Sequence, residues 1–294
     1  MHEIRATLTK KKQAKIILFV LDGVGGIPNP KLTELEAAKT PFLDKITKKS
    51  ETGCHIPILS GLTPGSGAAH LALFGYDPLR YDIGRGILEA LGSDVSVSEK
   101  DVLIRGNFST VKNVGSKIII DDRRAGRITT DTNKRIIKLL QSKINKIDGV
   151  GVEFTSGLEH RFVCKLKFKN KLNSSEVYIL DTDPEEVGVA PLIPKNLNQK
   201  SQKVSKIVVK LVNLIKETLK KENKANYALL RGFSIYPKIP TFEALYGLKA
   251  GSIVTYPMYK GISKLVGMNP LYVKNNTIES QFETLIKEYD NYDF

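Results

Sequence analysis

The sequence predicts an α/β fold in which a mostly parallel sheet, flanked by helices, is interrupted by an inserted α+β domain. A short apolar run, residues 16–21, ends at an Asp-Gly turn, as the buried strands of parallel sheets do. From about Val95 the chain changes to alternating, strand-like segments, and after Pro240 the α/β pattern returns. The length of 294 residues exceeds the size at which single cores stop growing, which favours two domains.

The first part of the core, residues 1–94, begins with the predicted strand Lys15–Leu21. The carboxyl end of this strand places Asp22 where open α/β sheets bind their ligands. Two helices, a short strand, and a glycine-rich turn that leads into an alanine- and leucine-rich helix are predicted next: 34–38, 42–49, 55–59 and 60–74. The order of strand, turn and helix is that of an α/β unit.

The inserted domain, residues 95–236, is expected to form a sheet with one face covered by helices. Its predicted strands are 102–105, 106–111, 117–120 and 161–168, and its predicted helices are 133–144 and 204–220. The second helix has its apolar residues on one stripe, which is typical of a face that packs against a core. The first domain then resumes in residues 237–294, with a strand over 252–256 and a helix over 258–266.

Composition and charge limit the function classes. Hydrophobic residues make up 41% of the chain and charged residues 26%, as in folded globular proteins. A net charge of +14 attracts nucleic acids, membranes and anionic substrates alike, but the lysines are spread along the chain, which argues against a nucleic-acid partner. The apolar run 16–21 is too short to span a bilayer, and residues 1–12 lack a signal-peptide core. We therefore expect no membrane partner and a cytoplasmic location.

Asp22 is the first candidate for chemistry. A carboxylate at a strand end, next to glycines that let ligands approach, is a common position for a metal ligand. A simple Asp-Gly turn explains the same segment equally well. A dinucleotide-binding turn is disfavoured, because Gly23, Gly25 and Gly26 do not have the G-x-G-x-x-G spacing and an acidic residue would repel a pyrophosphate.

Ser66 is the second candidate, because it lies at the start of a predicted helix, in the stretch 63–67. Backbone N–H groups and the helix dipole favour a phosphate at such a position, and a base or a metal ion can activate a serine as a nucleophile. Taken alone, the stretch is better explained by an N-cap serine. A P-loop is excluded, since the lysine of that motif is missing.

Other polar residues are ambiguous one by one. They are Arg123, Arg124, Arg127, His160, Arg161, Asp181 and His70. The first three follow a predicted strand, and their guanidinium groups suit a carboxylate or phosphate as well as an exposed turn. The His-Arg pair opens a strand and the aspartate closes one, which fits either an active site or a structural turn. The remaining histidine lies one helical turn beyond Ser66, where it faces the serine or lies on the helix surface.

Twelve motifs carry a family resemblance. They are LDGVGG at 21–26, TPGS at 63–66, HLALFGYDP at 70–78, GRG at 84–86, EALG at 89–92, RGNF at 105–108, DRRAGRI at 122–128, HRFV at 160–163, DTDP at 181–184, LRG at 230–232, YGLKA at 246–250 and YP at 256–257. In order and wording they resemble the archaeal-type cofactor-independent phosphoglycerate mutases of the alkaline phosphatase superfamily. The resemblance covers the chain from Lys15 onward and implies an alkaline-phosphatase-like core sheet.

The resemblance also implies a reaction and the residues that perform it. The family interconverts 3-phosphoglycerate and 2-phosphoglycerate through a phosphoserine, with two divalent metal ions, manganese or magnesium, and without a bisphosphoglycerate cofactor. Ser66 is then the nucleophile, and Asp22 and Ser66 are metal ligands. The implied substrate-binding residues are Arg123, Arg124, Arg127, His160, Arg161 and Arg231, and the residues implied to orient neighbouring groups are His70 and Asp181.

Two features depart from the family pattern. Gly67 follows the nucleophile, where the family usually has an acidic residue. In the family, the segment that begins like Tyr292 continues into further strands and into Asp and His metal ligands that this sequence does not contain. We therefore expect an incomplete core sheet, an isolated chain without mutase activity, and a separately encoded C-terminal fragment as a partner. The alternatives are a sister phosphatase or phosphotransferase for another phosphorylated metabolite, and a non-catalytic binding module.

Overall fold

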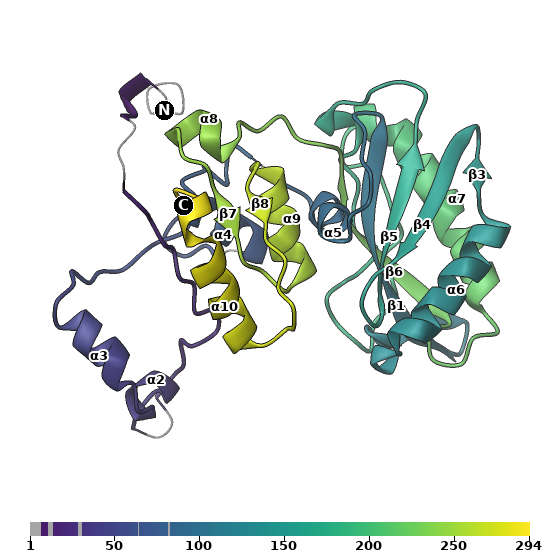
Figure 1. The fold of residues 1–294 in the computed structure, drawn as a ribbon. Coiled ribbons are helices and arrows are strands. Elements are labelled where there is room, and N and C mark those ends of the chain that lie inside the picture. Colours follow the sequence, from purple (N-terminus) through teal and green to yellow (C-terminus); the bar gives the residue numbers. More distant parts are fainter. Residues whose placement is uncertain (1–6, 11–13, 29–30, 64, 82) are drawn as a thin grey trace.

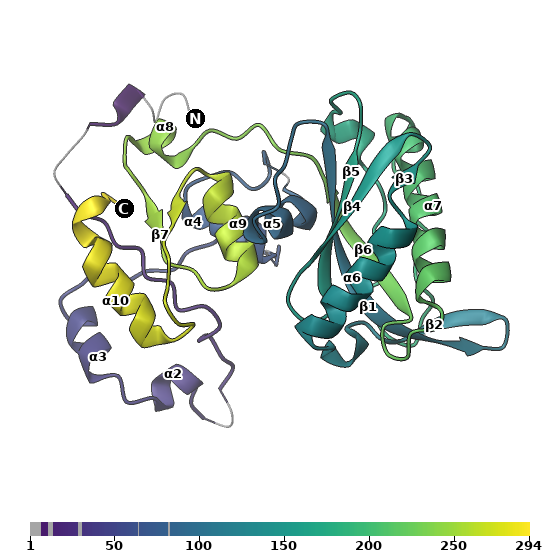
Figure 2. The same cartoon turned by 45° about the vertical axis from the view of Figure 1, so that its right-hand side comes forward.

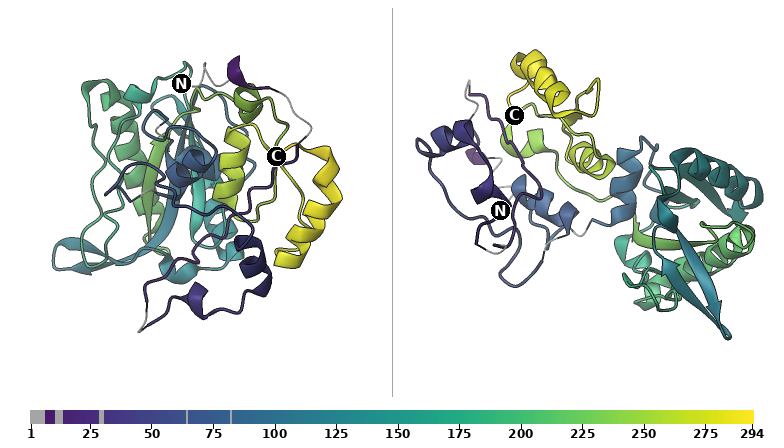
Figure 3. Two further views of the ribbon diagram at one scale, coloured as in Figure 1. Left: turned by 90° about the vertical axis from the view of Figure 1, so that its left-hand side faces the viewer. Right: turned by 90° about the horizontal axis from the view of Figure 1, so that it is seen from below.

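The computed structural model describes residues 7–10, 14–28, 31–63, 65–81 and 83–294. They form two bodies side by side, a six-stranded sheet with its helices and a mostly helical body that contains the C-terminus (Figure 1). Helix α5, Arg85–Gly92, lies between the two bodies (Figure 2). The view from below shows the same division (Figure 3).

The sheet is built around one long central strand. Its strands are β1 Asp101–Val114, β2 Lys117–Asp122, β3 Lys146–Ile147, β4 Val150–Ser156, β5 Arg161–Lys167 and β6 Tyr227–Ser234. They pair antiparallel in the order β2-β1-β5-β4-β3, and β6 also pairs with β1. The register places Arg105 opposite Arg231, and Asn107 opposite Arg161. Because paired residues and residues two apart share a face, these three arginines lie on one face of the sheet.

Helices cover both faces of this sheet. On one face lie α6, Thr130–Lys143, and α7, Gln202–Leu219 (Figures 1 and 2). The apolar stripe predicted for α7 is buried, which confirms the prediction: Val204, Ile207, Val208, Leu211, Ile215 and Leu219. On the other face, Leu103 and Val163 join Ile87 of α5 in a second core cluster. The prediction of helices on one face was thus incomplete.

The second body is mostly helical. Its helices are α2 Glu34–Ala37, α3 Pro41–Thr47, α4 Ser66–Leu73, α8 Phe242–Tyr246, α9 Pro257–Leu265 and α10 Ile278–Glu288. Two short strands, β7 Gly251–Ser252 and β8 Asn269–Pro270, pair in parallel. In the part of the chain that the structure describes, no helix combines the length and apolar character needed to cross a bilayer.

Glycines allow the two bodies to meet closely at α5 and α9. A Cβ atom at Gly92 would lie 1.9 Å from the Pro257 carbonyl oxygen, and one at Gly261 would lie 2.0 Å from the Leu88 carbonyl oxygen. Both distances are far below van der Waals contact, so any side chain at these positions would push the helices apart. The close packing holds the sheet body against the helical body.

The parallel core sheet expected from the sequence is not confirmed. The main sheet is antiparallel, and parallel pairing occurs, within the described residues, only between β7 and β8. The strand predicted over residues 15–21 is wrong, because this segment is irregular and the apolar side chains of residues 16–21 are 42–58% exposed. Residues 55–59 are likewise irregular. An apolar run becomes a buried strand only if neighbouring strands accept and donate its backbone hydrogen bonds. In this run the Ile16 N–H donates to the Asp293 carbonyl, at 2.9 Å, and Asp293 does not belong to a strand.

Candidate active site

Ser66 begins helix α4, as its sequence position predicts. Gly65 is the N-cap residue, with extended backbone angles, and the Ser66 side chain is exposed. A ring nitrogen of His70, Nδ1, lies 2.8 Å from the Ser66 carbonyl oxygen. The histidine therefore faces the serine from one helical turn further on, which is one of the two positions that the sequence allows.

Tyr259 joins the two leading candidates. Its hydroxyl donates a hydrogen bond to Asp22 Oδ2, and the Ser66 side chain lies close enough to act on its pKa. Its ring stacks on the His70 ring, with 4.3 Å between the centroids. Burial, followed by the bond to Asp22, raises the pKa of Tyr259 to about 12. The phenol is thus protonated at neutral pH and acts as a donor.

Tyr259 was not among the site residues predicted from the sequence. It lies on α9, almost 200 residues after Ser66, and only the neighbouring Tyr256-Pro257 pair belongs to a quoted motif. Nothing local marks it, since a tyrosine in the first turn of a helix usually packs against a core. Only the packing of α9 against α4 brings it to Asp22.

A cavity of about 270 Å³ opens beside Ser66. Its walls come from both bodies: Ser66 and Gly67 on α4, Arg85 and Leu88 on α5, Arg105 on β1, and Tyr256 before α9. The volume lies below the range of roughly 300–1,000 Å³ for drug-sized ligands, so the cavity suits a small metabolite. The exposed hydroxyl and two guanidinium groups thus share one small space at the junction between the bodies.

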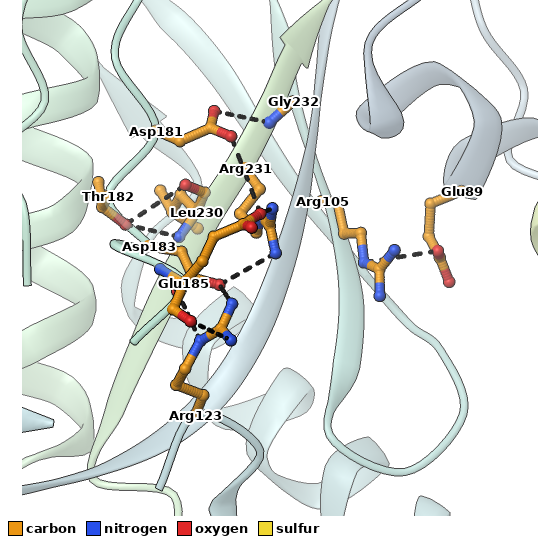
Figure 4. A network of polar contacts seen from close by, with 10 residues as sticks. All are labelled: Glu89, Arg105, Arg123, Asp181, Thr182, Asp183, Glu185, Leu230, Arg231 and Gly232. Carbon is orange, nitrogen blue, oxygen red and sulfur yellow. Dashed lines mark hydrogen bonds and ion pairs between the residues drawn. The ribbon is translucent and has the colours of Figure 1, made fainter. Parts of the chain in front are cut away.

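Arg105 is held by one buried carboxylate. Its Nε lies 3.7 Å from Glu89 Oε2, and the two side chains are 13% and 4% exposed (Figure 4). The same Nε is buried and has no hydrogen-bond partner among the described residues. Burial lowers the pKa of Arg105, and Glu89 opposes this. Arg161 lies beside this pair, with its guanidinium 5.5 Å from the Tyr256 ring centroid.

Arg123 and Arg231 meet in a separate network around one buried carboxylate (Figure 4). Asp183 accepts two hydrogen bonds from Arg123, at 2.9 Å each, and one from Arg231, at 3.2 Å. Glu185 completes the network, since its carboxylate pairs with Arg231 and its carbonyl accepts from Arg123 at 2.8 Å. Asp181 lies beside it, and accepts from the Gly232 amide at 2.8 Å. Burial raises the pKa of Asp181.

His160 is buried next to several arginines. Its side chain is 2% exposed, with Nδ1 3.7 Å from Glu159 Oε2. Burial, and then the positive charges of Arg161 and Arg124, lower the pKa of His160 to about 4, so the ring is neutral at pH 7. Arg127 lies in the same group, 3.5 Å from Glu159. The structure thus gathers these predicted residues on the sheet body, while Asp22, Ser66 and His70 gather on the helical body.

The oxygen atoms of Asp22 and Ser66 fit a divalent ion in kind. Manganese and magnesium prefer such hard oxygen ligands, and one hydroxyl, that of Tyr259, lies close to both side chains. The fit is partial, because these ions take about six ligands. Among the residues that the structure describes, no group of three or more His, Cys, Asp or Glu side chains is arranged to hold a metal ion.

Comparison with known proteins shows close relatives. The chain is 50% identical over 293 residues to a probable 2,3-bisphosphoglycerate-independent phosphoglycerate mutase of Aquifex aeolicus, covering 99% of this chain and 72% of the relative. A relative of the same description from Thermosipho melanesiensis is 47% identical over 294 residues, covering all of this chain and 71% of the relative.

Solved structures share the fold at lower identity. A cofactor-independent phosphoglycerate mutase from Thermoplasma acidophilum is 23% identical, with a TM-score of 0.55, and the match covers 79% of this chain and 63% of that one. A protein from Pyrococcus horikoshii is 23% identical, with a TM-score of 0.61, and the match covers 81% and 57%. A family model described as 2,3-bisphosphoglycerate-independent phosphoglycerate mutase matches residues 47–225. The resemblance seen in the sequence is therefore confirmed, and the chain belongs to the family of 2,3-bisphosphoglycerate-independent phosphoglycerate mutases.

Proposed function

We propose that this chain carries the nucleophile and substrate-binding residues of a phosphoglycerate mutase, which interconverts 3-phosphoglycerate and 2-phosphoglycerate through a phosphoserine at Ser66. One observation carries the proposal: Ser66 lines a small cavity that Arg85 and Arg105 also line. A phosphorylated three-carbon acid is small and strongly anionic, which suits this space. The family name describes enzymes that work without 2,3-bisphosphoglycerate, in agreement with a phosphate that is carried on the protein.

In the proposed reaction, the Ser66 oxygen attacks the substrate's phosphorus and loses its proton. The bond between phosphorus and the substrate oxygen breaks, and that oxygen takes up a proton to give free glycerate. Glycerate then turns within the cleft, and its other hydroxyl attacks the phosphoserine, which regenerates Ser66. A retained, reoriented intermediate makes the second transfer effectively intramolecular.

Asp22 and Ser66 are the proposed ligands of a divalent ion, manganese or magnesium. Such an ion, when bound, lowers the energy of the serine alkoxide and neutralises charge on the phosphoryl group. The chain's own residues hold the substrate. The proposed clamps for its anionic ends are Arg123, Arg124, Arg127, His160, Arg161 and Arg231, with His70 and Asp181 orienting their neighbours. Charge-assisted hydrogen bonds from arginine suit both carboxylate and phosphate.

The remaining metal ligands are proposed to come from a further segment. The chain spans about 72% of the curated relatives' length, and a large apolar cavity, about 640 Å³, lies between residues 16–21 and α10. A segment that adds strands there would bury the exposed side chains of this run. We propose that a separate C-terminal fragment or a continuation of the chain fills it, and that the assembly works in the cytoplasm.

The test is intact-protein mass spectrometry after incubation with 3-phosphoglycerate and manganese, in the presence of the complementing segment. The wild-type chain should gain one phosphoryl group and the Ser66→Ala variant should gain none, while NMR follows the appearance of 2-phosphoglycerate. Phosphate that persists on the variant would exclude Ser66. Phosphoserine that forms from other phosphomonoesters, without any 2-phosphoglycerate, would instead favour the sister phosphotransferase.

A further inference from the structure

The proposed function leaves open which groups hold the phosphoryl group next to Ser66. The arginines expected from the sequence lie on the sheet body, and three of them face carboxylates. Arg123 and Arg231 share Asp183 and Glu185, and Arg127 lies 3.5 Å from Glu159. The cavity that contains Ser66 is lined instead by two other arginines, neither of which was an individual candidate. Their surroundings decide what the cavity binds.

The charges around the cavity do not cancel. Arg85 and Arg105 line it, and Arg161 lies against its Tyr256 wall. Arg85 and Arg161 each lie close enough to Arg105 for their positive charges to interact with its own. The carboxylates that act on Arg105 and Arg85 are Glu89, which is 4% exposed, and Asp181. The guanidinium groups outnumber them, which favours an anion such as a phosphomonoester, whose charge at neutral pH is about −1.5 to −2.

The donors also point to an anion. Arg85 and Arg105 line the cavity, and a guanidinium group carries five N–H donors and no acceptor, so both side chains favour an anionic partner. Arg105 Nε itself faces Glu89 Oε2, at 3.7 Å. Gly65, Ser66 and Gly67 bring the first turn of α4 to the same cavity. The amides of this turn have no acceptor within the helix and carry its positive dipole. Side-chain and backbone donors therefore converge on one small space.

We propose that Arg85 and Arg105, together with the first backbone amides of α4, bind the phosphoryl group that moves to and from Ser66. Glu89 acts through Arg105 as a positioning residue, because its buried carboxylate lies 3.7 Å from Arg105 Nε. The clamps on the sheet body are then left for the carboxylate end of the substrate. This inference rests on the proposed function for the identity of the anion, but the binding of phosphate can be measured without it.

The experiment titrates the full 294-residue chain with inorganic phosphate and follows binding by ³¹P NMR. Arg85→Gln and Arg105→Lys should each weaken phosphate binding by about tenfold, which is about 1.4 kcal/mol. Arg85 is exposed, so its variant should fold even if Arg105→Lys does not. The matched control is Arg135→Gln, which removes the same charge from a pair with Glu222 on the sheet body.

Two outcomes separate this inference from the proposed function. Phosphate binding that depends on Arg85 and Arg105, in a protein that never forms phosphoserine, would support the binding site and overturn the mutase. Phosphoserine formation with unchanged phosphate affinity in both variants would support the mutase and overturn the binding site. A wild-type chain that binds phosphate no better than either variant would also overturn it.

Discussion

Asp183 is completely buried, yet it accepts two parallel hydrogen bonds from Arg123, each 2.9 Å long. A third bond, from Arg231 at 3.2 Å, connects the strand β6 to the same carboxylate. The carboxylate thus ties three segments that are far apart in sequence. Removing one partner of a buried ion pair leaves an uncompensated charge, which is more damaging than removing both.

Asp183→Asn should therefore lower the free energy of unfolding by about 3 kcal/mol, measured by urea denaturation. The control is Asp131→Asn, which removes an exposed carboxylate 3.5 Å from Lys134 and should cost less than about 1 kcal/mol. Equal unfolding midpoints for Asp183→Asn and the wild type would show that the pair contributes no net stability.

The stability of the protein should fall as the pH drops from about 6.5 to about 4. Burial lowers the pKa of His160 to about 4, from 6.5 in the unfolded chain. In this window the unfolded chain binds a proton that the folded chain does not, so acidification favours unfolding by up to about 1.4 kcal/mol per pH unit. Above pH 6.5 neither state is protonated at this site and the effect vanishes.

The measurement compares urea unfolding at pH 7, 6, 5 and 4 in the wild type and in His160→Gln. The variant should have a flatter dependence, since glutamine does not titrate. His55→Gln, at an exposed position, is the control and should keep the wild-type slope. Parallel curves for the wild type and His160→Gln would contradict the prediction.

Gly261→Ala should destabilise the protein by about 1 to 3 kcal/mol, because the added methyl group would meet the Leu88 carbonyl oxygen at 2.0 Å. The helices α5 and α9 would have to separate, and they carry Arg85 and Tyr259 of the site. Thermal unfolding is the measurement. Gly53→Ala, where a Cβ meets nothing within 4 Å, should leave the unfolding temperature almost unchanged, and a similar result for Gly261→Ala would argue against close helix packing.

Arg124→Ala should reduce kcat/KM about 10- to 150-fold in an assembly reconstituted with the complementing segment. A charge-assisted hydrogen bond to the substrate is worth about 1.5 to 3 kcal/mol. Arg124 is exposed, so its replacement should not impair folding, and a loss of activity would reflect a lost substrate contact. Arg80→Ala, whose side chain lies over the Tyr81 ring at 5.6 Å, is the control and should keep full activity. An unchanged kcat/KM for Arg124→Ala would place this side chain outside the substrate site.

The 294-residue chain alone, with manganese, should show no measurable interconversion of the phosphoglycerates. Asp22 and Ser66 are the two proposed ligands, and a divalent ion needs several more to offset its dehydration. The addition of a C-terminal segment from the Aquifex aeolicus relative should restore turnover, followed by NMR of both products. Robust turnover by the chain alone would mean that other residues of this chain, or of a second copy, complete the metal site.

The local sequence was enough to predict those helices whose residue spacing or preceding turn is distinctive. The stripe of α7 is buried as its spacing of apolar residues requires, and Ser66 begins a helix because a glycine-rich turn precedes an alanine- and leucine-rich run. The family followed from twelve short motifs, and the comparisons confirm it. For the two helices the signal lies within a few residues of the feature, and for the family it is the sum of motifs from residue 21 to residue 257.

Tertiary structure decided what depends on distant partners. Tyr259 contacts Asp22 only because α9 packs on α4. Arg105 lines the Ser66 cavity only because α5 packs on both β1 and α9. The apolar run 16–21 has the composition of a buried strand, but a strand exists only through hydrogen bonds to its neighbours, so its local pattern could not determine its structure. Side chains from four separate segments share one cavity, and no local pattern encodes that meeting, because packing free energy is a property of the whole chain.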